Sequence, residues 1–301
     1  MLCADAAGPA MRSKLWRVPE VLSIQSAVAY GFVGNSCAAF ALRRAGIDVW
    51  PVDTVNFSNN TDYGTWRGPI MTIEQVTDVV KGVDERGVLA RVDAVLSGYQ
   101  GAPDMGKAIL DAVRLTRERN PEAIYCCDPV MGDADLGFYA AAGIPEFMRE
   151  RVVAEATVMT PNLFELEYLT DCAPSTFTDV LDAVAKLRER GPETVLVTSV
   201  VGFDDDVDGM RMVAQNGSQT WQVVTPMIDQ KFTGSGDLTS SLFLASLLNG
   251  ESLGEALSSV ASAVYSVLKR TNELGRRELA LVQAQDEMVA PSHRFEAEQI
   301  A

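Results

Sequence analysis

Short apolar segments alternate with longer amphipathic segments along most of the chain. Residues 21–24, 93–98 and 123–129 are short, apolar and bounded by Gly, Ser, Asp or Pro, which is typical of buried strands. Residues 73–88 and 105–119 instead carry apolar side chains at helical spacing. Strands that alternate with helices form a parallel sheet with helices on both faces. The pattern therefore predicts an α/β fold.

The rest of the chain extends this pattern. It predicts further strands at 48–55, 156–160 and 194–198, and helices at 37–44, 162–170 and 176–190. Pro51 favours an edge position or an irregularity for the first of these strands. Residues 208–224 predict a hairpin about Asn216 and Gly217, and residues 56–70, rich in Asn, Gly and aromatic side chains, predict a flap. From residue 235 to about 289 we expect helix.

No repeat or linker divides the chain. We therefore expect one domain over residues 20–301, preceded by a flexible extension over residues 1–19 in which Met11 offers a second start.

One glycine motif precedes an apolar run that predicts a helix, namely Thr233-Gly234-Ser235-Gly236-Asp237. Glycines at a helix N-terminus expose free N–H groups, which bind anions. A carboxylate at this position can take a proton while the amides hold a phosphate, which suits phosphoryl transfer to a hydroxyl. The same residues also fit a plain turn in which Asp237 is only an N-cap.

The net charge and the small number of histidines limit the kinds of function that this chain can have. The net charge is −16, from 25 Lys and Arg against 41 Asp and Glu, which argues against a nucleic-acid or anionic-membrane binder. The single histidine, His293, excludes a multi-histidine metal site, and a His-based triad unless the C-terminal tail folds back.

The compartment follows from the cysteines and from the N-terminus. The five cysteines have no CxxC spacing, and the adjacent Cys126 and Cys127 are expected on opposite faces of a strand. No stretch approaches the length of a membrane span and no apolar signal region precedes the domain, so we expect a soluble cytoplasmic protein with reduced thiols.

Polar residues recur where the predicted strands end. Ligands of open parallel sheets bind at the carboxyl ends of the strands. The residues found there are Ser26, Tyr99, Asp128, Thr160, Asn162, Thr198 and Ser199. Together they predict one elongated groove.

Several segments, in a fixed order, carry a resemblance to a known family. They are Ser23-Ile24-Gln25-Ser26, Phe57-Ser58-Asn59, Leu96-Ser97-Gly98-Tyr99, Cys127-Asp128-Pro129-Val130-Met131-Gly132, Thr160-Pro161-Asn162 and Gly234-Ser235-Gly236-Asp237. Spread over roughly residues 20–290, they resemble the ribokinase-like superfamily of small-molecule kinases and, within it, the pyridoxal kinases.

The resemblance implies a fold and an activity. The fold would be a three-layer sandwich with a mostly parallel central sheet and a small β flap. The activity would be ATP-dependent phosphorylation of the 5′-hydroxyl of pyridoxal to pyridoxal 5′-phosphate, with Mg²⁺ and a potassium-type cation, in a homodimer.

The resemblance also assigns residue roles. Asp237 matches the general base, beside an anion hole of Gly234, Ser235 and Gly236. The substrate side matches Ser26, Tyr99 and the flap residues Thr61 and Asp62, of which Asp62 departs from the neutral residue expected there. Asp128 and Glu165 match positions near Mg²⁺ and the triphosphate. The remaining ATP positions are Thr160, Asn162, Thr198, Ser199 and an adenine segment of Thr225, Pro226, Met227 and Ile228.

Two other functions fit the same motifs. A hydroxymethylpyrimidine kinase, or another ribokinase-like kinase, would share the glycine motif and differ around Ser26, Tyr99 and the flap. A non-catalytic B6-binding protein would keep the fold, but the intact Asp237 argues against it.

Overall fold

A computed structural model describes residues 17–203 and 208–301. Most of the predicted N-terminal extension, with Met11 and Cys3, lies outside the described residues. The strands are β1 (Glu20–Val28), β2 (Asp48–Phe57), β3 (Ala94–Ser97), β4 (Ile124–Cys127), β5 (Gly132–Asp133), β6 (Gly137–Phe138), β7 (Val158–Met159), β8 (Thr194–Val200), β9 (Met210–Asn216), β10 (Gln219–Thr225) and β11 (Glu298–Gln299).

The helices lie close to their predicted bounds as far as residue 248. They are α2 (Asn35–Arg44), α3 (Ile73–Asp84), α4 (Met105–Arg119), α5 (Ile144–Phe147), α6 (Leu163–Thr170), α7 (Phe177–Arg188), α8 (Ser235–Leu248) and α9 (Leu253–Glu273). Shorter turns are η1 (Thr61–Tyr63), η2 (Leu89–Arg91), η3 (Met148–Val152) and η4 (Gln285–Met288).

Among the described residues, nine strands form one sheet in the order β11-β10-β9-β8-β7-β4-β3-β1-β2. Each neighbouring pair from β2 to β8 is parallel, whereas β9, β10 and β11 add antiparallel pairs at the other side. Pro51 lies on β2, the edge strand, where its missing N–H costs no ladder bond. The predicted α/β fold with a mostly parallel sheet is confirmed.

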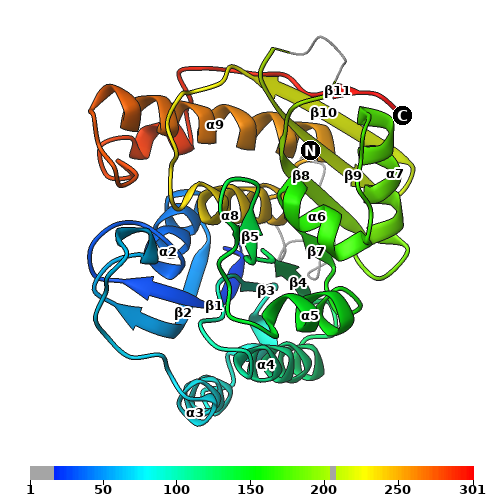
Figure 1. The fold of residues 1–301 in the computed structure, drawn as a ribbon. Helices are drawn as coiled ribbons and strands as arrows, with labels where there is room; N and C mark the ends of the chain where they lie inside the picture. Colours follow the sequence, from blue (N-terminus) through cyan, green and yellow to red (C-terminus); the bar gives the residue numbers. More distant parts are fainter. Residues whose placement is uncertain (1–16, 204–207) are drawn as a thin grey trace, which may run out of the picture.

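Two apolar cores cover the two faces of the sheet, because successive strand residues point to opposite sides. In β4, Cys126 belongs to the core under α2, α8 and α9, whereas Tyr125 and Cys127 belong to the core under α3, α4, α5, α6 and α7. Figure 1 shows α8 and α9 side by side, and α9 also packs directly against β9 and β10. Both cysteines are buried free thiols, as predicted.

The flap, residues 56–70, folds back along the edge strand β2. The Asn56 N–H donates to the Pro69 carbonyl (3.0 Å) and the Ser58 N–H to the Arg67 carbonyl (2.7 Å). The turn η1 forms its tip and ends at Gly64, whose φ of 75° favours glycine. Because η1 follows β2 without a second full strand, the flap is an irregular hairpin.

The predicted continuous helix from 235 to about 289 is wrong in two places. Gly250, with φ 85°, ends α8, and the Ser252 hydroxyl then caps α9. Gly275, with φ 60°, follows the end of α9, and the chain turns back toward the flap. The sequence pattern also missed β11, because two residues carry no periodicity.

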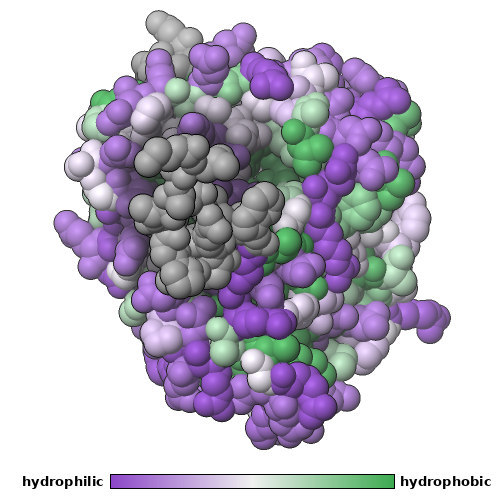
Figure 2. Space-filling model, turned by 180° about the vertical axis from the view of Figure 1, so that it is seen from behind, coloured by the Kyte–Doolittle hydropathy of each residue, from purple (hydrophilic) through white to green (hydrophobic). Residues whose placement is uncertain are grey.

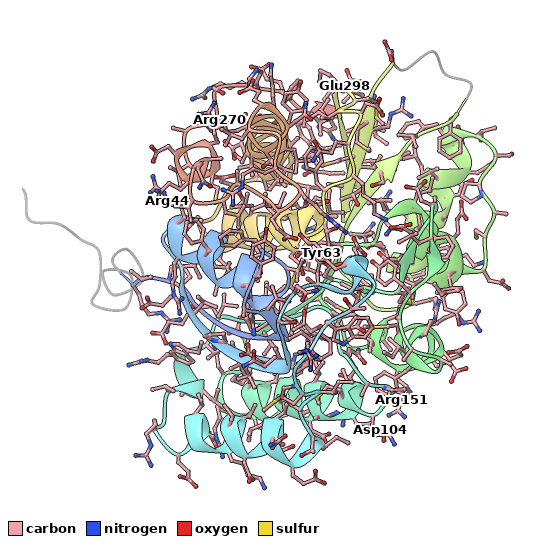
Figure 3. All side chains as sticks on the ribbon, turned by 60° about the vertical axis from the view of Figure 1, so that its left-hand side comes forward. Arg44, Tyr63, Asp104, Arg151, Arg270 and Glu298 are labelled. Carbon is pink, nitrogen blue, oxygen red and sulfur yellow. The ribbon has the colours of Figure 1, made fainter. Side chains whose placement is uncertain are left out.

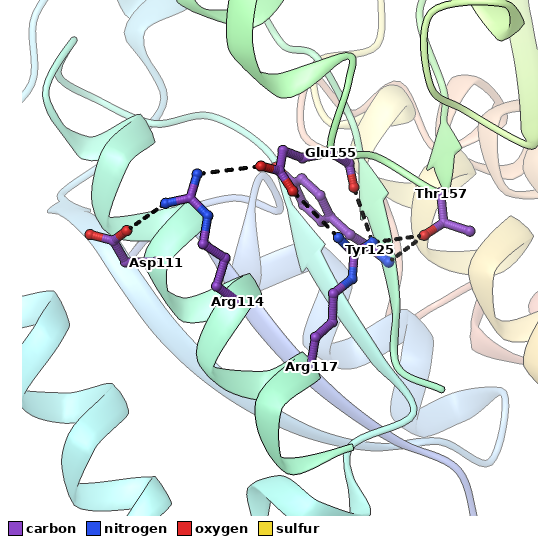
Figure 4. Close-up of polar contacts among 6 residues, drawn as sticks. All are labelled: Asp111, Arg114, Arg117, Tyr125, Glu155 and Thr157. Atoms are coloured by element: carbon purple, nitrogen blue, oxygen red, sulfur yellow. Dashed lines mark hydrogen bonds and ion pairs between the residues drawn. The ribbon is translucent and has the colours of Figure 1, made fainter. Parts of the chain in front are cut away.

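Arginines of α4 bond to the amino ends of the parallel strands, on the side of the sheet opposite their carboxyl ends. Arg117 donates to the Glu155 carbonyl (3.0 Å) and to the Thr157 hydroxyl (3.1 Å), and Arg114 forms an ion pair with Glu155 (Figure 4). Thr157 in turn accepts the Tyr125 N–H (3.1 Å). This network holds α4 against the start of β4 and β7. The carboxyl ends of the strands, on the opposite side, are not involved in it.

The outer surface is largely polar on the side opposite Figure 1. Figure 2 shows hydrophilic residues over most of that face, with hydrophobic ones in small separate patches. Within the described ranges, no helix combines the length and the apolar character needed to cross a membrane.

Candidate active site

The glycine motif forms the N-terminus of the buried helix α8. Gly234 adopts φ 95°, and a Cβ there would lie 2.1 Å from the Phe32 carbonyl oxygen, so only glycine fits. The neighbouring Ser235 N–H already donates to the Phe232 carbonyl over 3.3 Å. The predicted anion hole is therefore a true helix N-terminus, and one of its three amides is in part engaged.

Gly34 brings the predicted base and a predicted substrate residue together. A Cβ on Gly34 would lie 2.3 Å from the Ser26 hydroxyl oxygen, so Ser26 packs directly against this glycine. The backbone N–H of the same glycine hydrogen-bonds the Asp237 carboxylate. Residues 26 and 237, far apart in the sequence, thus face each other across one glycine.

A β-bulge explains the position of Ser26. β1 continues past its predicted end to Val28, and its register with β2 shifts between Gln25 and Ala27. A bulge bends the strand and turns a side chain out of the ladder, which places Ser26 at the loop before α2.

Burial dominates the electrostatics of Asp237. It raises the pKa of this carboxyl from 3.8 to about 6, although the N–H groups of Gly34 and of Asp237 itself lower it. A carboxyl with a pKa just below neutrality is mainly ionised at pH 7 and still accepts a proton readily. Asp237 therefore has the properties of a general base.

Asp128 follows β4 and lies beside the same helix N-terminus. A Cβ on Gly236 would be 3.7 Å from Asp128 Oδ2, and Asp128 is only 6% exposed. Its burial, followed by the negative charges of Glu165 and Asp237, raises the pKa of Asp128 well above its ordinary value, against a hydrogen bond with Ser240 that lowers it. The Asp128 carboxyl is thus buried close to two other negatively charged side chains.

Glu165 is held by backbone amides. Its Oε1 accepts the Met131 N–H (2.9 Å) and its Oε2 the Asn162 N–H (3.0 Å), as part of the capping box of α6. Burial raises the pKa of Glu165 to about 8, and these N–H groups oppose the rise. The residue thus supports the loop after β4, a role that the sequence reasoning did not foresee.

Asn162 completes this support. Its side-chain oxygen accepts the Glu165 N–H (2.9 Å) and its side-chain amide donates to the Gly132 carbonyl (2.8 Å). Both polar groups of the Asn162 side chain therefore bond to protein atoms. Asn162 acts on the predicted ATP side indirectly, by positioning the loop after β4.

The other predicted nucleotide residues lie at the same carboxyl edge. The Thr160 hydroxyl is buried without a hydrogen-bond partner among the described residues, which leaves it available to a ligand. Thr198 and Ser199 lie at a register shift of β8 against β9, and Ser199 has φ 57°. Bulges and left-handed residues of this kind are common beside active sites.

The predicted adenine segment leaves the end of β10, which points the same way as β8. Thr225 is buried in β10, whereas Met227 is 55% exposed in the loop beyond it. Pro226 and Ile228 belong to this loop. The segment therefore starts at the predicted groove but is open to solvent.

Tyr99 and the flap carry the remaining residues predicted for the substrate side. Tyr99 is partly buried, which raises the pKa of its hydroxyl, and its carbonyl accepts the Thr54 hydroxyl (2.9 Å). Thr61 is exposed at the flap tip. Asp62 accepts a hydrogen bond from the hydroxyl of Thr233, the first residue of the glycine motif. The Asp62 carboxylate, which was not expected in the flap, thus connects the flap to the N-terminus of α8.

Two residues of this region were missed by the sequence reasoning. Glu278 accepts hydrogen bonds from the flap residues Asn60 (3.0 Å) and Tyr63 (2.8 Å), and Arg277 lies over the Tyr63 ring. They belong to a segment that we expected to be helical, and no motif marks them.

Comparison with known proteins places the chain among related kinases. The family model described as phosphomethylpyrimidine kinase matches residues 80–281. The pyridoxal kinase PdxY of Rubrobacter xylanophilus is 51% identical over 283 residues, which cover 94% of this chain and 98% of that protein. The pyridoxal kinase PdxY of Corynebacterium diphtheriae is 46% identical over 94% of this chain and 100% of its own.

Solved structures give the same result. The pyridoxal kinase of Leishmania donovani in complex with ADP and pyridoxamine superposes with a TM-score of 0.86 at 28% identity, over 94% of this chain and 99% of that one. The pyridoxal kinase of Trypanosoma brucei gives 0.82 at 26% identity, over 93% and 99%. By sequence identity and by fold over nearly its whole length, the chain belongs to the pyridoxal kinase family.

Proposed function

We propose that this protein is a pyridoxal kinase that transfers the γ-phosphoryl group of ATP to the 5′-hydroxyl of pyridoxal. The observation that carries the proposal is the Asp237 carboxylate, which lies at the N-terminus of α8 and is joined to Ser26 through Gly34. The relatives described as pyridoxal kinases support the substrate, and the Leishmania donovani complexes with ADP support the nucleotide.

In this mechanism Asp237 takes the hydroxyl proton as the hydroxyl oxygen attacks the γ-phosphorus. The bond between the γ-phosphorus and the bridging oxygen breaks, and ADP leaves with that oxygen. N–H groups at the start of α8 stabilise the charge on the transferred group, since they and the helix dipole favour anions. Positioning and charge stabilisation supply most of the rate in phosphoryl transfer.

The substrate pocket is formed by Ser26, Tyr99 and the flap. Ser26 presents its hydroxyl to the pyridine ring, and Tyr99 lines the same pocket. Thr61 and Asp62 cover the substrate from the flap, because the bond from Thr233 holds the flap tip against the α8 N-terminus.

The residues present fit a Mg²⁺ ion. Hard divalent ions take oxygen ligands, often one or two carboxylates with phosphates and water. In the part of the chain that the structure describes, no group of three or more His, Cys, Asp or Glu could hold a metal alone, so phosphate oxygens complete such a site. Asp128 would contact the ion or its water, and Glu165 would act from the loop that it supports. When bound, the ion neutralises negative charge on the phosphates.

The nucleotide would lie along the carboxyl ends of β7, β8 and β10. The free Thr160 hydroxyl and the bulge residues Thr198 and Ser199 would bind phosphate oxygens. The loop from Thr225 to Ile228 would contact adenine. Asn162 holds the loop after β4 in place, as its hydrogen bonds indicate.

Replacing the base tests the proposal. Asp237→Asn keeps the size of the side chain and removes its ability to take a proton. We expect kcat to fall by about 10²–10⁴-fold, while pyridoxal binding, measured by equilibrium titration, is largely retained. Asp104→Asn, at an exposed position just before α4, is the matched control and should keep full activity. Turnover at the wild-type rate in the Asp237→Asn variant would contradict the role of the base.

A hydroxymethylpyrimidine kinase is the second candidate, because the matching family model carries the description phosphomethylpyrimidine kinase. Competition kinetics with pyridoxal, pyridoxine and hydroxymethylpyrimidine separate the two. A kcat/KM for hydroxymethylpyrimidine above that for pyridoxal would favour the second candidate, and absence of pyridoxal turnover would refute the first.

Several sequence predictions stay predictions. They are the homodimer, the potassium-type cation, the cytoplasmic location and the single kinase domain over residues 20–301. The continuous sheet from β1 to β11 supports the last of these.

A further inference from the structure

The tip of the flap is held by residues from the other end of the chain. Glu278, in the turn after α9, is 4% exposed and its Oε1 accepts the side-chain amide of Asn60 (3.0 Å) and the hydroxyl of Tyr63 (2.8 Å). Tyr63 is labelled on the flap in Figure 3. One buried carboxylate oxygen thus joins two flap residues to a segment more than 200 positions away.

Arg277 adds a second attachment beside the first. Its guanidinium lies 3.8 Å from the centre of the Tyr63 ring and donates to the Asp62 carbonyl (2.8 Å). The Asp62 carboxylate accepts the Thr233 hydroxyl at the same time. The flap tip is therefore fastened to both the C-terminal turn and the catalytic glycine motif.

Glu278 also contacts the loop that carries Gly34. A Cβ on Gly31 would lie 2.0 Å from Glu278 Oε2, and this oxygen has no hydrogen-bond partner among the described residues. A buried carboxylate that receives only neutral donors on one oxygen costs folding free energy. A buried polar atom without a partner calls for an explanation, and a functional role is one of those known in proteins.

We propose that Glu278 is a positioning residue that, together with Arg277, latches the flap over bound pyridoxal. The latch consists of Asn60, Tyr63, Arg277 and Glu278. Its part in catalysis rests on the proposed function, because the flap covers Ser26 and Asp237 in that proposal. The hydrogen bonds hold the pyridoxal pocket shut and leave the nucleotide side, at β7, β8 and β10, untouched.

Kinetics of latch variants test the proposal. Tyr63→Phe removes one hydrogen bond and keeps the ring under Arg277, and Glu278→Ala removes both acceptor contacts. We expect KM for pyridoxal to rise about threefold to tenfold in Tyr63→Phe and further in Glu278→Ala, with KM for ATP unchanged. Glu278→Gln keeps an acceptor oxygen and should fall between wild type and Glu278→Ala. Glu296→Ala, at an exposed position, is the control.

Hydrogen exchange of the flap amides gives a readout independent of activity. Exchange over residues 58–68 should be faster in Tyr63→Phe and in Glu278→Ala, and unchanged in the control. If Glu278→Ala does not fold, Tyr63→Phe alone decides, since it removes only a hydroxyl.

Unchanged exchange and unchanged KM in Tyr63→Phe would overturn the latch, and so would an equal rise of KM for both substrates. Faster flap exchange in a protein that does not phosphorylate pyridoxal would refute the proposed function and retain the latch as a structural feature.

Discussion

Asp237 shows how one residue acquires its chemistry from its surroundings. An aspartate at the start of a helix is usually a solvated N-cap with a low pKa. Here burial raises the pKa to about 6, and the N–H of Gly34 keeps the carboxylate form accessible. Cys37, buried beside it, has a raised pKa because of burial and of the Asp237 charge, so it stays a neutral thiol. The base therefore faces no competing anion from this cysteine.

The pKa of Asp237 predicts the acid side of the pH profile. Only the ionised carboxylate accepts a proton, so kcat/KM for pyridoxal should fall about tenfold per pH unit below an apparent pKa near 6. Initial rates between pH 4.5 and 8 with saturating ATP measure this limb. A profile that stays flat from pH 7 down to 5 would contradict the assignment of Asp237 as the base.

At the scale of elements, the loop before α2 couples the substrate side to the catalytic side. Gly34 has φ 52° and leaves no space for a Cβ beside Ser26, while its N–H hydrogen-bonds Asp237. The bulge at Ser26 and the helix N-terminus at Gly234 are local features, but this loop sets the distance between them. A change in the loop should therefore affect both binding and turnover.

Gly34→Ala tests this coupling. The new Cβ would lie 2.1 Å from the Ser26 carbonyl oxygen, so the loop must shift and both KM for pyridoxal and kcat should deteriorate, by tenfold or more in kcat/KM as an order of magnitude. Gly46→Ala is matched, because Gly46 also has positive φ, but no atom of residues 17–203 or 208–301 lies within 4 Å of the added Cβ. It should lose about 1 kcal/mol of stability and keep its kinetics. Equal kinetic losses in both variants would assign the effect to backbone strain alone.

At the scale of the whole molecule, the fold collects acidic groups from three distant elements. Asp128 after β4, Glu165 in α6 and Asp237 in α8 all have raised pKa values, because each is buried and Asp128 also feels the other two charges. A carboxyl whose pKa is higher in the folded state binds more protons when folded. The stability of the ligand-free protein should therefore decrease as pH rises from about 4 to about 8 through these groups.

Asp128→Asn tests this balance between stability and function. Because burial and the charges of Glu165 and Asp237 disfavour the ionised Asp128 carboxyl, the substitution should raise the Tm of the ligand-free protein, by about 2–4 °C for each kcal/mol gained, while kinase activity is lost. The gain should be smaller at pH 5 than at pH 8, because the ionised form of a carboxyl with a raised pKa becomes more populated as the pH rises. Thermal unfolding followed by fluorescence at both pH values measures the difference.

Asp179→Asn is the control of opposite sign. Hydrogen bonds from Ser175 and Thr176 lower the pKa of Asp179 to about 2, so its contribution is present above pH 4 and lost in acid. This variant should lower the Tm at pH 8. A lower Tm of Asp128→Asn than of the wild type at pH 8 would contradict this prediction. It would show that the Asp128 carboxylate stabilises the folded protein even without a bound ligand.

The candidate site could be predicted in part from local patterns. Polar residues after strands, such as Ser26, Asp128 and Thr160, mark the ligand edge because parallel strands end together. The glycines of the Thr233–Asp237 motif mark a helix N-terminus for equally local reasons. Glu165 shows where prediction from local patterns ends. Its spacing from Asn162 fits both a metal-side residue and a capping box, and only the structure shows that its carboxylate accepts hydrogen bonds from backbone N–H groups.

The amino-acid sequence by itself determined the α/β class, an edge or irregular position for Pro51 and the glycine-rich N-terminus of α8. Periodicity, glycine and proline act through hydrogen bonds and sterics over a few residues, so they can be recognised without the fold. Only the tertiary structure decided that Gly34 lies between Ser26 and Asp237 and that Glu278 holds the flap. These contacts join segments far apart in the chain, and the order of strands in the sheet and the packing of its helices bring them together.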